Sequence, residues 1–447
     1  MELNKNVLRP SSPLFNNLIR SIIRYPLFKM SGLYTGRKIS TNLSKIYNFY
    51  SLDNNNQEKK IKEKLIKILK EAKKSKFYKE KISDVIIDKI SIDMKFINDL
   101  PITTKEDLLD APENFFTKEC DIRKLIRSNT NGSQGPSAAI FYDQYASDAS
   151  SSITWFCRSF YEKVYKNTTL HLAADLAENS KPLPAMIDWA RFFSTNRFNI
   201  FISSLEDQST ELYLNNILKR KYQIIHSHPS TLYHLALYAS ENNIKVDKCF
   251  NIFESSGEKL FDYQKNIISK IFKCKIIDRY GFAETGIVAY QLPFFKDFLT
   301  IMRHHCLIEN SKNNDDNLII TNFNNNIFPL IRYRNGDKII TEDSSIPRYI
   351  KEIKGREHSI QKFGGKTLST TYIMDILSHT LSGILDFQVK PGNNPIIYIA
   401  LEKNSNINKK LISDKLLKLT QVQFEICFQN LENMKKKGLR NKYSHII

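Results

Sequence analysis

The sequence has no long apolar run, and its few cysteines are not arranged in pairs. No stretch of about 18 consecutive apolar residues occurs in the 447 residues, which argues against a transmembrane helix. Residues 1–10 lack the continuous apolar stretch of a secretory signal. The six cysteines are scattered without a C-x-x-C pair, which argues against a zinc site and a disulfide framework. We therefore expect a cytoplasmic protein.

Charge of one sign is in excess, because the formal net charge is +19. Such a charge can indicate nucleic acid or an anionic membrane surface as a partner. However, lysine, isoleucine and asparagine are frequent in every segment, as in Asn54-Asn55-Asn56 and Asn324-Asn325-Asn326. This spread is what coding bias of an AT-rich genome produces, and no recognised nucleic-acid motif accompanies it. We expect no nucleic-acid partner.

Glycine is also scarce, yet nine of the 14 glycines lie in five short polar clusters. Glycine is used where the backbone takes a positive φ or where a ligand approaches closely. Glycines gathered beside Ser, Thr, Glu, Arg and Asp therefore indicate ligand-facing loops. The clusters are Thr130–Pro136, Ser255–Glu258, Tyr280–Gly286, Tyr333–Asp337 and Gly355-Arg356 with Gly364-Gly365.

The chemistry of these clusters fits a nucleotide. Thr130–Pro136 offers backbone N–H groups and hydroxyls to a phosphate. Tyr280–Gly286 offers an aromatic face and a carboxylate for a metal, and Tyr333–Asp337 offers a carboxylate for sugar hydroxyls. Together they predict a nucleotide site.

These clusters, in this order and spacing, resemble the motifs of the adenylate-forming (AMP-binding) superfamily, on the branch of phenylacetate–CoA ligases and CapK-like capsular polysaccharide proteins. Five blocks in register are far more specific than one. The resemblance covers roughly residues 55 to 440. The matching segments are Thr130–Pro136 for T-S-G-S-T-G-x-P (one residue shorter), Tyr280–Glu284 for Y-G-x-T/S-E, Arg332–Asp337 for R-Y-R-x-G-D, Gly355-Arg356, and, more weakly, Leu100–Lys105 and His228–Ser230.

The resemblance implies a phosphate loop at the first cluster. Thr130, Ser133 and the backbones of Gly132 and Gly135 would surround the β- and γ-phosphates of ATP. The loop lacks the family's lysine before its proline. Neutralisation would then come from Mg²⁺ and from cations elsewhere, with Lys105 as a candidate.

The resemblance also implies roles around the base and the sugar. Glu284 would be the Mg²⁺ ligand beside the α-phosphate, since this hard cation takes one or two carboxylates plus waters. Tyr280, followed by Gly281, would stack on adenine. Asp337 would accept hydrogen bonds from both ribose hydroxyls, and Arg356 would meet the ribose or phosphate. Glu258 would line the acyl or adenine pocket.

Two segments depart from the family pattern. The acidic residues that usually follow the hinge arginine are replaced by His358 and Ser359. The family's catalytic lysine stands in a G-K-x-R-like setting, whereas this chain reads Lys436-Lys437-Gly438. Lys437 is the candidate, acting with Glu284 and Thr130, and Lys442 is second. A solvated basic tail is the alternative.

The pattern of the chain predicts an α/β fold, with a large layered α/β adenylate-forming N-terminal domain and a small α+β C-terminal cap domain. Short strand-like runs alternate with amphipathic helical stretches, which argues for α/β layers. The expected strands are 168–172, 200–203, 223–225, 250–253, 275–278 and 395–401, and the expected helices include 57–81, 231–241 and 263–272.

We expect a large ATP- and substrate-binding domain over 1–353 and a small mobile domain over 354–447. Residues 1–55 are expected to form an N-terminal helical extension. Its segment 11–30 has apolar residues at helical spacing. A helix packed on the enzyme body is expected there, and an interfacial helix making peripheral membrane contact is the alternative.

The function implied is an AMP-forming ligase that activates a small carboxylic acid as an acyl-adenylate, with ATP, Mg²⁺ and coenzyme A as candidate cofactors. The acceptor is a thiol, as in coenzyme A, or an amine, and the CapK resemblance suggests surface polysaccharide biosynthesis. An acyl-protein synthetase, with Cys427 as acceptor, is one alternative, although a buried structural thiol is expected there. A non-catalytic nucleotide-binding homologue is the other.

Overall fold

The computed structural model describes most of the chain between residues 36 and 434. The segments outside the description are 1–35, 130–137, 162–167, 175–196, 203–206, 220, 296, 311–315, 345, 357–359, 370–372, 374–375, 378–383, 402–404, 406 and 435–447. The helix expected over 11–30 lies outside the described residues.

The described residues divide into two compact units, each built from two segments of the chain. Unit 1 takes residues 168–278 and 354–434, and unit 2 takes residues 36–161 and 279–353. One division falls at Ile353, but residues after it group with 168–278. The domain limits expected from the sequence therefore stay a prediction.

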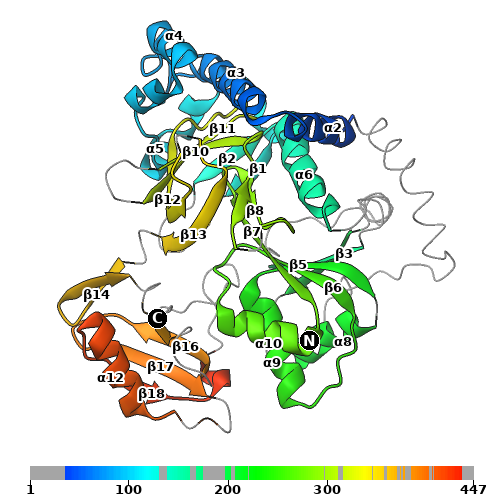
Figure 1. Ribbon diagram of the computed structural model, residues 1–447, viewed down its shortest axis with the longest axis vertical. Coiled ribbons are helices and arrows are strands. Elements are labelled where there is room, and N and C mark those ends of the chain that lie inside the picture. Colours follow the sequence, from blue (N-terminus) through cyan, green and yellow to red (C-terminus); the bar gives the residue numbers. More distant parts are fainter. Residues whose placement is uncertain are drawn as a thin grey trace, which may run out of the picture. The chain divides into compact units, whose positions relative to one another are not determined.

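Unit 2 begins with a layer of helices (Figure 1). Asp53 caps the longest of them, α3, by accepting a hydrogen bond from the backbone N–H of Asn56. The stripe expected from the sequence (Ile61, Leu65, Ile68 and Leu69) is buried. The helices of unit 2 are α2 (Ile39–Tyr50), α3 (Asn54–Ala72), α4 (Asp84–Ile92), α5 (Lys105–Asp110) and α6 (Gln144–Ser159), with the 3₁₀ helices η1 (Met94–Asp99), η2 (Pro112–Phe115) and η3 (Ile122–Lys124).

The helix expected over 57–81 ends earlier, at Ala72. The chain turns after it, and the Tyr78 side chain enters the core, where its hydroxyl lies 2.9 Å from Thr103 Oγ1. A continued helix would not bring this tyrosine to that partner, so the tertiary contact sets the end of α3.

The sheet of unit 2 is antiparallel in the pairs β10–β11, β11–β12, β13–β9, β9–β8 and β8–β7. Its strand order is β10-β11-β12-β13-β9-β8-β7, and β1 pairs with β2 separately. The bounds are β1 (Ile126–Asn129), β2 (Ala139–Tyr142), β7 (Lys275–Phe282), β8 (Gly286–Tyr290), β9 (Leu299–Ile301), β10 (Cys306–Asn310), β11 (Asn317–Asn322), β12 (Tyr333–Thr341) and β13 (Tyr349–Arg356).

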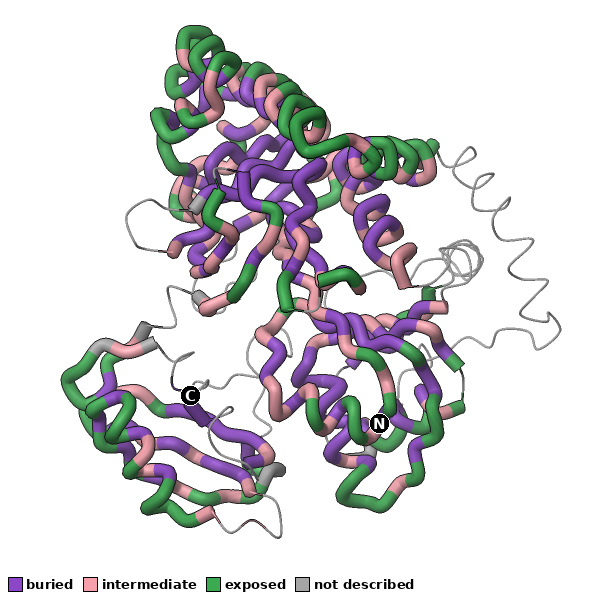
Figure 2. Tube along the Cα trace, viewed as in Figure 1, coloured by how far each residue is buried: buried purple, intermediate pink, exposed green. Residues whose placement is uncertain are grey.

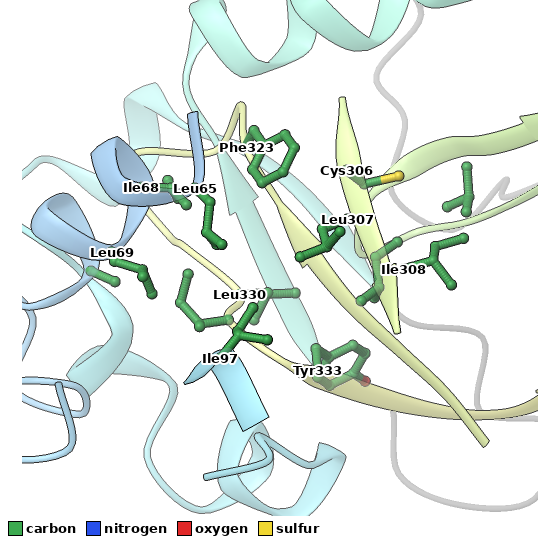
Figure 3. Close-up of a cluster of buried hydrophobic side chains, with 14 of the residues drawn as sticks. Leu65, Ile68, Leu69, Ile97, Cys306, Leu307, Ile308, Phe323, Leu330 and Tyr333 are labelled. Atoms are coloured by element: carbon green, nitrogen blue, oxygen red, sulfur yellow. The ribbon is translucent and has the colours of Figure 1, made fainter. Parts of the chain in front are cut away.

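The core of unit 2 lies between α3 and this sheet. In Figure 3, Leu65 and Leu69 of α3 lie opposite Leu307 of β10, with Leu330 and Tyr333 close by. Figure 2 shows the strands of this unit as largely buried, whereas α3 and α4 carry exposed residues along their outer sides. Burial of this apolar face is what holds the helical layer on the sheet.

Unit 1 contains a parallel sheet in the order β4-β3-β5-β6-β7, where β7 contributes its first half. Helices follow the strands, as the alternating pattern predicts. The elements are β3 (Thr169–Ala174), β4 (Arg197–Ile202), α8 (Asp207–Leu218), β5 (Tyr222–Ser227), α9 (Pro229–Glu241), β6 (Phe250–Ser255) and α10 (Asp262–Phe272). Every expected strand and helix of this region is present within a few residues.

The C-terminal segment of unit 1 is a small α+β assembly. It packs on α9 and α10, because the Tyr233 hydroxyl donates to the Leu385 carbonyl and the Tyr263 ring lies 6.0 Å from that of Phe387. The expected fold class is confirmed by these layers. The elements are β14 (Ile360–Phe363), β15 (Lys366–Ser369), β16 (Ile384–Lys390), β17 (Ile396–Leu401), α12 (Lys409–Thr420), β18 (Glu425–Phe428) and η6 (Leu431–Met434).

Within the described part of the chain, no helix has both the length and the hydropathy needed to cross a bilayer.

Candidate functional site

A tight turn joins β7 to β8 in unit 2 and carries Glu284. We call Ala283–Thr285 the Glu284 turn. Gly281 has no room for a side chain, because a Cβ there would overlap the Gly286 carbonyl. Gly286 itself has a φ of +80°, which glycine adopts without strain. The two glycines of this block are therefore required by the turn that presents Glu284.

Two carboxylates of unit 2, Glu284 and Asp337, are linked by a reciprocal pair of tyrosines. Tyr280, on the strand that leads to Glu284, donates its hydroxyl to Asp337 Oδ2 at 2.6 Å. Tyr333, on the strand that leads to Asp337, donates to Glu284 Oε1 at 3.2 Å. Both carboxylates are 7% exposed. Each carboxylate is thus fixed by the strand that carries the other.

Asp337 is held further by its own turn. Gly336 has a φ of +82°, and Asn335 Oδ1 accepts from the Asp337 backbone N–H at 3.0 Å. The Asn335 amide also donates to Asp337 Oδ2 at 3.0 Å. These two hydrogen bonds fix the orientation of the Asp337 carboxylate.

Arg332 supports this strand, a role that the sequence did not indicate. It is 7% exposed and has a φ of +49°, in the left-handed region. Its Nε donates to Glu309 Oε2 at 3.1 Å, and its Nη1 donates to the Asn98 carbonyl at 3.0 Å. A buried arginine that is both paired and hydrogen-bonded fixes the backbone just before Tyr333.

The Leu100–Lys105 segment, one of the weaker motifs, forms a bridge with this block. Thr103 donates its backbone N–H to the Arg332 carbonyl at 3.0 Å and accepts from the Arg334 N–H at 2.9 Å. Thr104 then caps α5 in a reciprocal arrangement with Asp107. The segment therefore has a structural part in positioning the R-Y-R-x-G-D strand.

The backbone around Glu284 is bonded from a second direction. The Tyr142 hydroxyl donates to the Ala283 carbonyl. Burial, and secondly the Glu284 carboxylate, raise the pKa of Tyr142 well above its usual value. The phenol therefore stays protonated and remains a donor.

Several expected site residues lie outside what the structure describes. The phosphate-loop residues Thr130, Gly132, Ser133 and Gly135 belong to 130–137, and Lys437 and Lys442 belong to 435–447. His358 and Ser359 also lie outside the description. The backbone of Arg356 ends β13, but its side chain is not among the described groups.

A second polar group lies in unit 1, where β5 and β6 end. We call it the strand-end cluster, and it comprises His226, His228, Glu254, Ser256 and Glu258. His226 Nε2 lies 2.6 Å from Ser256 Oγ, and its Nδ1 lies 4.0 Å from Glu254 Oε2. Ligands of parallel α/β sheets bind outside the carboxyl ends of the strands. The cluster therefore occupies a place where a ligand is expected.

Glu258 in this cluster has a structural partner that its expected role did not include. Its Oε2 accepts from the backbone N–H of Ser230 at 3.2 Å, in the first turn of α9. A carboxylate at a helix N-terminus satisfies a free donor and complements the dipole. Its Oε1 is buried without a hydrogen-bond partner among the described residues.

Two curated proteins are similar to this chain in sequence. No protein-family model matches the chain. The chain is 23% identical over 353 residues to protein CapK of Staphylococcus aureus, a match that covers 76% of this chain and 78% of CapK. It is 28% identical over 178 residues to the indoleacetate–lysine synthetase of Pseudomonas savastanoi, covering 39% of this chain and 43% of the synthetase.

Among solved structures, 2-hydroxyisobutyryl-CoA ligase in the postadenylation state with R3-HIB-AMP has a TM-score of 0.71 to this chain. The match has 13% identity and covers 89% of this chain and 90% of the ligase. The chain is therefore similar in sequence to CapK and shares its fold with an adenylate-forming ligase. The resemblance stated from the motifs is confirmed, and with it the expected class of AMP-forming ligase.

The described residues fit the way adenylate-forming enzymes would hold Mg²⁺. No group of three or more His, Cys, Asp or Glu side chains forms a metal cage in the described part of the chain. Mg²⁺ is usually held by one or two carboxylates together with waters and substrate phosphates. Glu284 is one buried, oriented carboxylate, so it suits a metal that arrives with ATP.

Cys427, the candidate acyl acceptor, is half-buried, so the buried thiol expected from the sequence is wrong. Its Sγ lies 3.6 Å from Glu425 Oε1 on the same strand. Burial, and next the Glu425 carboxylate, raise the pKa of the Cys427 thiol. A raised pKa lowers the fraction of the nucleophilic thiolate, which disfavours an acceptor role.

Proposed function

We propose that this protein activates a carboxylic acid with ATP and then transfers the acyl group to a thiol or an amine. The carboxylate oxygen attacks the α-phosphorus, the bond to the β-phosphate oxygen breaks, and pyrophosphate leaves with its electron pair. The acyl-adenylate then reacts with the acceptor, and AMP leaves. The observation that carries the proposal is the reciprocal pair Tyr280–Asp337 and Tyr333–Glu284.

In this proposal each group of the pair has one task. Asp337 accepts hydrogen bonds from the two ribose hydroxyls, and the face of Tyr280 stacks on adenine. Glu284 would hold Mg²⁺, which supplies positive charge to the phosphates when bound. Because both carboxylates are oriented before ATP binds, little reorganisation is needed during the reaction.

The remaining assignments rest on the sequence motifs. Thr130, Ser133 and the backbones of Gly132 and Gly135 would bind the β- and γ-phosphates, and Arg356 would meet the ribose or phosphate. Lys437 would stabilise negative charge on the transferring phosphorus. We expect Lys437→Ala to slow adenylation and leave ATP affinity nearly unchanged, because a contact made only in the transition state acts on the chemical step. Lys442→Ala is the control.

The acceptor is proposed from the relatives. A solved complex of 2-hydroxyisobutyryl-CoA ligase contains coenzyme A, and the Pseudomonas relative is named as a synthetase that joins indoleacetate to lysine. The relation to CapK supports a place in surface polysaccharide biosynthesis. We propose that the enzyme works in the cytoplasm, since all six cysteines are free thiols.

The domain limits, 1–353 and 354–447, are part of the proposal. A mobile small domain exposes its linker to proteases. Limited proteolysis should therefore cut first between about Ile346 and Gly364, and ATP with the acid should change the rate of that cut. Even cleavage along the chain would contradict these limits.

The direct test is pyrophosphate exchange into ATP over a panel of carboxylic acids. Glu284→Gln keeps the side-chain shape but removes the charge that holds the metal, so the exchange rate should fall about a hundredfold or more. Glu342→Gln is the matched control, because Glu342 pairs with Arg348 at 2.5 Å outside this site, and its rate should stay near wild type. Full activity in Glu284→Gln would refute the metal assignment, and no exchange with any acid would favour a nucleotide-binding homologue without catalysis.

A further inference from the structure

His305 belongs to a histidine pair, His304-His305, that the motifs do not include. It ends a tight turn between β9 and β10, where its backbone N–H donates to the Met302 carbonyl at 2.8 Å. Its own carbonyl accepts from the Phe323 N–H at 2.9 Å. The residue is 1% exposed, so its ring has one fixed setting.

Both ring nitrogens of His305 have partners. Nε2 lies 2.6 Å from the Thr285 carbonyl oxygen, and Nδ1 lies 2.6 Å from the Asn324 side-chain amide nitrogen. A carbonyl oxygen only accepts, so Nε2 carries the proton, and Nδ1 accepts from the amide. Burial lowers the pKa of His305 to about 4, which keeps this neutral form near pH 7.

The carbonyl that His305 holds belongs to the Glu284 turn. Thr285 follows Glu284, and the carbonyl before it, at Ala283, accepts from Tyr142. The Ala283–Glu284 and Thr285–Gly286 peptide groups of this turn are therefore fixed by side chains from separate elements. Any rotation of the turn would break one of these hydrogen bonds and leave a buried polar group unsatisfied, which opposes the rotation.

We propose that His305 is a positioning residue for the metal-binding carboxylate, acting through the hydrogen bond from its Nε2–H to the Thr285 carbonyl. The inference rests on the proposed function of Glu284. Hydrogen-bonding partners behind a metal ligand typically change metal affinity about 10- to 100-fold when they are removed. His305 would act on Glu284 in this way through the backbone.

The test compares two neighbouring histidines. His305→Leu removes the donor, and His305→Gln keeps an amide N–H that can reach the Thr285 carbonyl. His304→Leu is the matched control, because His304 is also buried but lies 3.1 Å from the Tyr50 hydroxyl through Nδ1 instead of contacting the Glu284 turn. The readouts are the Mg²⁺ concentration for half-maximal exchange and the shift in melting temperature that ATP causes with Mg²⁺ or with a chelator.

We expect His305→Leu to raise the half-saturating Mg²⁺ concentration about tenfold and to reduce the Mg²⁺-dependent part of the melting shift. His305→Gln should recover most of both, and His304→Leu should lower the melting temperature without changing Mg²⁺ dependence. Equal Mg²⁺ dependence in His305→Leu and wild type would overturn the proposal.

If His305→Leu does not fold, the proposal can still be tested with two other variants. In that case His305→Gln is compared with His305→Asn, whose shorter amide reaches the position of Nδ1 but not that of Nε2. Equal Mg²⁺ dependence in these two variants would also overturn the positioning role. An inactive wild type with no Mg²⁺-dependent melting shift would instead refute the proposed function, so the two failures are distinguishable.

Discussion

The Glu284–Asp337 region of unit 2 and the strand-end cluster of unit 1 differ in how carboxylates are satisfied. In unit 2, Glu284 and Asp337 both accept tyrosine hydroxyls. In unit 1, the buried Glu258 Oε1 has no hydrogen-bond partner among the described residues. A buried polar atom without a partner costs free energy until a ligand meets it. The two carboxylates of the first region are thus oriented in advance, whereas Glu258 keeps one oxygen for a ligand.

The largest expected effect tests the rigidity of the first region. Arg332→Met removes the buried guanidinium that pairs with Glu309 and bonds the Asn98 carbonyl, so the free energy of unfolding should fall by about 3–5 kcal/mol. The double variant Arg332→Met with Glu309→Leu should recover part of this loss, because both members of the buried ion pair are then replaced by apolar side chains. Denaturant unfolding measures both. A loss below about 1 kcal/mol in the single variant would mean that this pair does not hold the strand.

The second-largest effect is expected from removing the two tyrosine hydroxyls that bond Asp337 and Glu284. Tyr280→Phe and Tyr333→Phe each remove a hydrogen bond to a carboxylate, which is worth about 1.5–3 kcal/mol. Each variant should lower kcat/KM for ATP about tenfold or more. The double variant should lose less than the sum, because the two bonds fix the same pair of strands. Strict additivity would show that the bonds act independently.

The control for these tyrosine variants is Tyr47→Phe. It removes the same hydroxyl from an exposed position, where the group donates to Ser159 Oγ at 2.7 Å. Its kcat/KM for ATP should stay within about twofold of wild type, as expected for a change on the surface.

A smaller effect is expected in the strand-end cluster. Ser256→Ala removes the hydroxyl beside His226, and a single hydrogen bond contributes about 1 kcal/mol. We expect KM for the carboxylic acid to rise about fivefold while KM for ATP and the Mg²⁺ dependence stay unchanged. Steady-state kinetics with the acid and ATP varied in turn separates the two. If only KM for ATP changed, the strand-end cluster and the Glu284–Asp337 region would not differ in the substrate they affect.

The smallest effect concerns the free-energy cost of burying the Lys64 amine in unit 2. Burial lowers the pKa of Lys64 from 10.5 to about 8. Between these values the folded chain has lost the proton and the unfolded chain still binds it, so the stability rises with pH across this window. The gain should be about 1 kcal/mol or more, after allowing for partial exposure of this lysine. Unfolding of wild type and Lys64→Met at pH 8 and pH 10 measures it, and an equal gain in both would contradict the assignment.

Much of the fold could be predicted from local sequence patterns. The parallel strands and helices of unit 1 follow an alternation that is visible in short windows, so β5, β6 and α10 are found within a few residues of their expected positions. Glycine-containing motifs marked Glu284 and Asp337 as residues of one site. Both are buried in unit 2, and each is joined to a tyrosine of the other's strand.

The supporting residues could not be predicted, because their partners are distant in sequence. Arg332 bonds Glu309 and Asn98, which lie 23 and 234 residues away. His305 reaches Thr285 across 20 residues. An isolated arginine or histidine in a strand-rich segment has no periodicity or motif that reveals such a contact. Only the folded arrangement identifies these residues.

The bridge between Thr103 and the Arg332–Arg334 backbone has a consequence for how the chain is made. It joins parts of unit 2 that come from residues 36–161 and 279–353, with all of 168–278 between them. During synthesis, residues 36–161 therefore leave the ribosome before residues 279–353, with which they pack. The parallel-sheet region of unit 1 emerges between them and begins to fold. Until residues near Arg334 appear, the apolar face of α3 lacks part of its packing partners, and transiently exposed apolar surface is prone to aggregate. The strand that carries Asp337 is therefore also the strand whose synthesis ends this interval.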